Sequence, residues 1–158
     1  MKYLVAGLLA AVCAGNEAHA AVLTAQQAQA IVAGCAGRSA GRHQSQAIAV
    51  VDTGGHLVAA LRMDGNGSGI MDFALAKAEA AAAWGFSTAQ MAESARETPG
   101  FAFAPHVVTV PGGLPIWSAD GRERLGAVGV SGEAPADDAA CAEAGIETAG
   151  LRSAPAPH

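Results

Sequence analysis

The sequence predicts an α+β domain in which helices pack on a mainly antiparallel sheet of five strands. Two hairpin signals support this fold: Asp52-Thr53-Gly54-Gly55 and Ala119-Asp120-Gly121-Arg122 each separate two apolar runs, and Gly residues favour tight turns. Hairpins make neighbouring strands antiparallel, and helical patterns flank them along the chain. The expected strands are Ala47–Val51, Leu57–Leu61, His106–Val110, Leu114–Trp117 and Leu125–Val130.

Residues 1–20 have the pattern of a secretory signal peptide. Lys2 supplies a positive start, Tyr3–Ala14 is an apolar run too short to span a bilayer comfortably, and Ala18-His19-Ala20 is an A-x-A cleavage pattern. An ordinary N-terminal helix is the alternative. Cleavage would leave 138 of the 158 residues, enough for one domain with one core. We therefore expect a periplasmic or secreted protein without a membrane anchor.

Composition narrows the class of partner. The net charge is −5, and no basic stripe or block occurs along the chain. Nucleic acids and anionic membranes are therefore poor candidates. Aromatic residues make up only 4% of the sequence, so the core must be built from small and β-branched residues that allow close backbone approach.

Four helices are expected around the strands. Thr24 with Gln27, and Ser87 with Gln90, form capping-box patterns that begin two of them. The clearest helix runs from Ile70 to Trp84, is rich in alanine and ends at Gly85. The expected helices cover 25–39, 70–84, 87–95 and 135–149, and the Pro/Ala-rich residues 152–158 are expected to be a disordered tail.

Two cysteines, Cys35 and Cys141, remain after the expected cleavage. In an oxidising compartment they could form a disulfide that closes most of the chain into one loop. They could equally be two buried thiols, because each lies in a predicted helix. Their spacing lacks a C-x-x-C pattern, which argues against a zinc site or thioredoxin-type chemistry.

Several motifs in order resemble the GlcG/HbpS-like family. They begin with Val51–Leu57, Arg62-Met63-Asp64 and Ala76-Lys77-Ala78, and continue with Pro111–Ile116 and Gly126–Gly132. The similarity extends from about Thr24 to Leu151, so we expect one GlcG/HbpS-like domain over residues 21–151. The resemblance implies a profilin-like fold, assembly into homo-oligomers, and a role in binding haem or a similar flat small molecule.

Haem binding would need an iron ligand, a flat apolar slot and cations for the propionates. His106 is the first candidate for the iron ligand, because it begins a predicted strand beside an irregular loop; His56, after the Gly-Gly turn, is the second. The Ala-rich helix and Phe101–Phe103 could form the slot. The candidate cations are Arg62, Lys77, Arg96, Arg122 and Arg124.

Two other classes of function stay open. An enzyme could use a polar cluster of Asp52, His56 and Lys77, although Asp52 could equally brace its turn and Lys77 lie on a helix surface. The sequence has no His-Glu-x-x-His or Gly-x-Ser-x-Gly motif, so no reaction is indicated. An oligomeric accessory subunit of an exported oxidoreductase or sensor is the third possibility.

Overall fold

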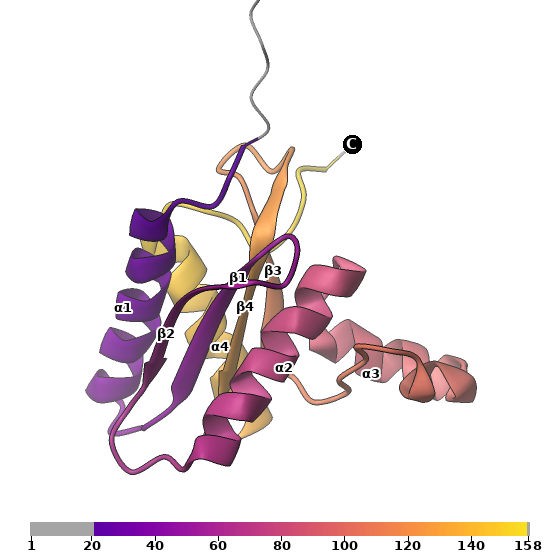
Figure 1. The fold of residues 1–158 in the computed structure, drawn as a ribbon, viewed down its shortest axis with the longest axis horizontal. Helices are drawn as coiled ribbons and strands as arrows, with labels where there is room; N and C mark the ends of the chain where they lie inside the picture. Colours follow the sequence, from indigo (N-terminus) through magenta and orange to yellow (C-terminus); the bar gives the residue numbers. More distant parts are fainter. Residues whose placement is uncertain (1–20, 158) are drawn as a thin grey trace, which may run out of the picture.

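The computed structural model describes residues 21–157 and contains one four-stranded antiparallel sheet with helices on both faces (Figure 1). The expected signal peptide lies outside the described residues. The strand order is β2-β1-β4-β3. In chain order the elements are α1 (Ala25–Gly41), β1 (Ala47–Asp52), β2 (Leu57–Arg62), α2 (Ser68–Trp84), α3 (Thr88–Glu97), the 3-10 helix η1 (Pro99–Phe103), β3 (Gly113–Trp117), β4 (Arg124–Ser131) and α4 (Pro135–Thr148).

Alternation along the central strands β1 and β4 gives the sheet two buried faces. Side chains of Ile48, Val50, Val128 and Val130 meet α1 and α4 in one core. The alternate residues of β1, which are Ala47, Ala49 and Val51, meet the alanines of α2 in a second core on the opposite face, together with Ala127 of β4. Both central strands are therefore apolar along nearly their whole length, as strands covered on both faces must be.

The small residues of α2 and β4 allow these two elements to approach closely. A β-carbon on Gly129 would overlap the carbonyl oxygen of Ala74, and it would lie 2.5 Å from the backbone nitrogen of Ala78. Only glycine fits at this crossing. The low aromatic content therefore corresponds to a core in which a helix backbone lies almost directly on a strand, as the composition predicted.

Local sequence signals place several element boundaries correctly. The amide of Gln27 donates to the Thr24 hydroxyl at 3.1 Å, and Ser87 and Gln90 form the same reciprocal box at α3. Gly85 ends α2 in the left-handed conformation, with φ of 76°. The helix α2 begins at Ser68, two residues before the expected start, with Gly67 at the N-cap and no side-chain cap.

The fifth strand expected at His106–Val110 is not formed, so the sheet has four strands instead of five. This segment is irregular: the amide of Val107 closes a turn onto the carbonyl of Ala104, and His106 has a positive φ of 57°. Apolar character alone made the segment resemble a strand. Such a run becomes a strand only where a neighbouring strand pairs with it, and none does here.

The segment expected to be a disordered tail packs on the β3–β4 hairpin up to the last described residue, Pro157. Arg152 exchanges two backbone hydrogen bonds with Trp117, and the amide of Ala156 donates to the carbonyl of Gly121. The Ser153 hydroxyl donates to Glu143. Backbone pairing thus orders a Pro/Ala-rich stretch whose composition alone favours disorder.

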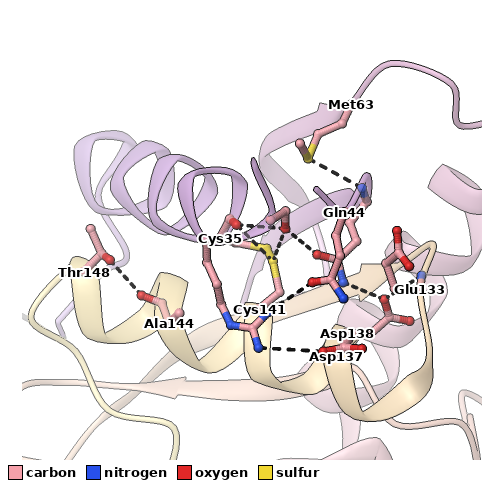
Figure 2. Close-up of a disulfide and its surroundings, with 12 residues drawn as sticks. Cys35, Gln44, Met63, Glu133, Asp137, Asp138, Cys141, Ala144 and Thr148 are labelled. Carbon is pink, nitrogen blue, oxygen red and sulfur yellow. Dashed lines mark hydrogen bonds and ion pairs between the residues drawn. A yellow bond between two sulfur atoms is a disulfide. The ribbon is translucent and has the colours of Figure 1, made fainter. Parts of the chain in front are cut away.

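A disulfide joins Cys35 of α1 to Cys141 of α4, with their Cα atoms 4.7 Å apart (Figure 2). Both residues are completely buried where the two terminal helices pack together. The pairing that the sequence left open is therefore formed. Among residues 21–157, no helix has both the length and the apolar character needed to cross a membrane.

Candidate functional site

A cavity of about 230 Å³ lies where the β1–β2 turn meets α2 and the loop that follows η1. Thr53, Gly54 and Gly55 line it from the turn, and His106 lines it from the loop. Glu79 and Ala83 line it from α2, where their spacing of four residues places them on the same helix face. The cavity therefore combines an imidazole, a carboxylate and a wall of very small residues.

Asp52 holds the turn that forms one side of this cavity. Its carboxylate accepts hydrogen bonds from the amides of Gly54, at 2.8 Å, and His56, at 2.9 Å. The hydrogen bond from the His56 amide is the main reason that the pKa of Asp52 is lowered. The charged form of the carboxylate is therefore the form that the turn stabilises. Asp52 thus braces its turn, as one of the two interpretations of the sequence expected.

His56, the second candidate ligand, does not line the cavity. Its Nδ1 atom lies 3.2 Å from the Asp52 carboxylate, and its side chain is 83% exposed. Of the two candidate histidines, the structure places only His106 at the cavity wall.

Arg62 and Arg96 lie away from the cavity. Arg62 is the last residue of β2, at the opposite end of the strand from the turn, and it donates to the carbonyl of Asn66. Arg96 is at the exposed end of α3, 3.9 Å from Glu93. Neither side chain lines the cavity.

Lys77 is buried in α2 rather than lying on a helix surface. Only 1% of it is exposed, and its ammonium donates to the carbonyl of Val130 at 2.8 Å and to Asp138 at 3.1 Å. Desolvation lowers the pKa of Lys77, and the nearby Asp138 carboxylate opposes this shift. The ammonium therefore faces protein atoms, and it is not part of the cavity wall.

The polar cluster of Asp52, His56 and Lys77 does not form, because the residues lie toward opposite ends of the sheet. Asp52 pairs with Gly126 at the start of β4, whereas Lys77 binds Val130 near the end of that strand. In the part of the chain that is described, no group of three metal-ligating side chains gathers either. A catalytic centre built on these residues is therefore not supported.

Arg124 lies beside the end of α2 and is not among the residues that line the cavity. Its guanidinium lies against Gly85, two residues after Ala83, so closely that a β-carbon there would overlap it. By contrast, Arg122 lies at the exposed tip of the β3–β4 hairpin beside Asp120. The sequence analysis did not select Glu79 as a site residue. The available signal was its spacing of four residues from Ala83, which places both on one face of the helix.

One family model matches most of the chain. A family described as "Haem degrading protein HbpS-like" matches residues 23–147. The crystal structure of a double mutant of HbpS from Streptomyces reticuli has a TM-score of 0.74 and 26% identity, over 90% of this chain and 97% of that chain. No curated protein sequence matches.

Two more solved structures share the fold. A complex of PduOC with haem has a TM-score of 0.76 and 20% identity, over 85% of this chain and 99% of that chain. The protein ORFY from Klebsiella pneumoniae has a TM-score of 0.75 and 24% identity, over 85% and 95% of the two chains.

Proposed function

The chain belongs to the HbpS-like family, and on that premise we propose that it binds haem or a related flat tetrapyrrole at the cavity beside the β1–β2 turn. The observation that carries this proposal is that His106, the first candidate ligand, is the histidine that lines the cavity. A neutral imidazole nitrogen is a common ligand of haem iron. The family description and the haem complex of a protein with the same fold support the choice of ligand.

The residues around the cavity fit one edge of such a ligand. Gly54, Gly55 and Ala83 leave a wall without bulky side chains. Arg124, which lies against Gly85 at the end of α2, is the cation that we propose for a propionate extending beyond the cavity. Because Glu79 would repel a propionate, we expect the carboxylate edge to face Arg124 instead. Bound haem would supply an iron centre with open redox and ligand chemistry.

The size of the cavity limits how the macrocycle can be held. Pockets that enclose a drug-sized ligand occupy roughly 300–1,000 Å³. The cavity here measures about 230 Å³. We therefore expect one chain to hold only part of the ring, with the remainder extending beyond the cavity.

A haemin titration of the protein lacking residues 1–20 tests this proposal. We expect a saturable, stoichiometric Soret shift for the wild type and at least a tenfold weaker affinity for His106→Ala, because loss of the iron ligand removes the strongest directed contact. His56→Ala is the matched control, since His56 is exposed and outside the cavity. We expect this control to bind like the wild type.

Each outcome of the titration has a distinct meaning. If the wild type shows no saturable shift, haem binding is wrong for this protein. If the shift weakens in His56→Ala and not in His106→Ala, the ligand assignment is wrong and haem binding stands.

We also propose that the protein is exported and begins at Ala21 after cleavage. The A-x-A pattern at residues 18–20 supports this, and so does the Cys35–Cys141 disulfide, since such bonds persist mainly in oxidising compartments. N-terminal sequencing of protein recovered outside the cytoplasm should begin Ala21-Val22-Leu23. A retained Met1 would contradict the cleavage.

A further inference from the structure

His106 has an unusual backbone conformation that a neighbouring side chain can explain. Within residues 21–157, the non-glycine residues with positive φ are His43 and His106. His43 follows Arg42, the C-cap residue of α1, and its amide donates to the carbonyl of Ala40, so helix termination accounts for its positive φ. His106 lies in the turn Ala104–Val107, which is closed by a 3.3 Å hydrogen bond between the end residues.

This turn has the features of type II geometry. Pro105 is its second residue, and the third residue, His106, has φ of 57°. Type II turns favour glycine or asparagine at the third position, because other side chains meet steric resistance there. A type I turn would suit histidine better, and the two types differ by rotation of the peptide between Pro105 and His106.

Trp84 binds the carbonyl of that same peptide. Its indole Nε1–H donates to the oxygen of Pro105 at 3.1 Å. Rotation to type I would turn this oxygen away and break the hydrogen bond. The indole is itself held by an edge-to-face contact with Phe101, with ring centroids 4.9 Å apart, so the donor is already in place before any ligand arrives.

Trp84 is also next to Ala83, which lines the cavity together with His106. We propose that Trp84 is a positioning residue for the ligand site: its indole N–H selects the type II turn and thereby directs the His106 imidazole to the cavity. The part of this inference that concerns binding rests on the proposed function. The part that concerns the turn can be measured without ligand.

The first test uses the apo protein and the variant Trp84→Phe, which keeps an aromatic ring and removes the donor. In a type II turn the Hα of Pro105 lies close to the amide proton of His106 and gives a strong NOE, whereas in type I these protons move apart. We expect the strong NOE in the wild type and its loss in Trp84→Phe. Trp117→Phe is the matched control, because the Trp117 indole nitrogen has no hydrogen-bond partner in the described part of the chain.

The second test is a haemin titration of the same three proteins. We expect Trp84→Phe to bind about five- to tenfold more weakly, with a changed Soret maximum, since one hydrogen bond no longer holds the ligand-bearing turn. Trp117→Phe should match the wild type in both respects. Amide dispersion in the NMR spectra confirms that all three proteins are folded.

The outcomes separate this inference from the proposed function. If the strong NOE persists in Trp84→Phe, Trp84 does not select the turn and the inference is wrong. If the NOE is lost while affinity and Soret maximum stay at wild-type values, the positioning role is wrong although haem binding stands. If the wild type binds no haem, the proposed function fails and the binding role of Trp84 fails with it, while the NOE comparison still decides what sets the turn.

Discussion

Replacement of both Cys35 and Cys141 by alanine is expected to lower the free energy of unfolding by about 4–5 kcal/mol. The disulfide joins residues 106 positions apart, so it closes most of the domain into one loop. In the chain-entropy model, the stabilisation comes from restricting the unfolded chain, and a loop of roughly 100 residues gives about 4.7 kcal/mol. Urea denaturation of the oxidised wild type and the double variant measures the difference.

A second measurement separates the cross-link from packing at the same position. Wild-type protein that is unfolded, reduced and refolded in reductant keeps both sulfur atoms and loses only the bond. We expect it to be nearly as unstable as the double alanine variant. A difference of less than about 1 kcal/mol between oxidised and reduced wild type would contradict a major role for this disulfide.

Lys77→Met is expected to destabilise the fold by about 3–5 kcal/mol, because it removes one partner of a buried ion pair and leaves the other charge behind. Asp138 is only 2% exposed. Without Lys77 it would keep hydrogen bonds from the side chain of Gln46, at 2.8 Å, and from the amide of Glu133, but it would lose its counter-charge. Chemical denaturation at pH 7 gives the free energy of unfolding for this comparison.

The exposed pair of Glu93 and Arg96 supplies a matched control. Both side chains are about 70% exposed, at 69% and 71%, so Arg96→Ala should cost less than about 0.5 kcal/mol. If Lys77→Met cost as little as this control, the buried pair would have no special role in stability.

The effect of Lys77→Met should also depend on pH. The pKa of Lys77 is lowered in the folded protein from its ordinary value of 10.5, so above the lowered pKa the unfolded state binds more protons than the native state. The stability of the wild type relative to the variant should therefore rise with pH in the window between the lowered pKa and 10.5. A relative stability that falls with pH in this window would contradict the burial of the ammonium.

Local sequence signals determined the hairpin of β1 and β2, the capping boxes of α1 and α3, and the end of α2 at Gly85. Each depends on residues within a few positions of one another, so the backbone requirement can be read directly from the sequence. The hairpin and helix patterns together indicated the α+β class, and the family motifs, read in order, added the HbpS-like family. These features needed no knowledge of contacts between distant segments.

The tertiary structure decided what depends on distant residues. The apolar segment His106–Val110 is not a strand because no strand pairs with it. Lys77 is buried because Asp138, 61 positions later, reaches it from the first turn of α4. The alanine-rich sequence of α2 gave no periodicity from which to recognise that burial.

The candidate site was likewise determined by packing between distant segments. His106 could be selected from the sequence as an uncommitted histidine, but its proximity to the β1–β2 turn and to Glu79 required the folded chain. The same holds for the pairing of Cys35 with Cys141. Sequence patterns thus selected candidate ligand-binding residues, whereas the packing of α2 and the His106 loop against the hairpin determined that His106 is the candidate that lines the cavity.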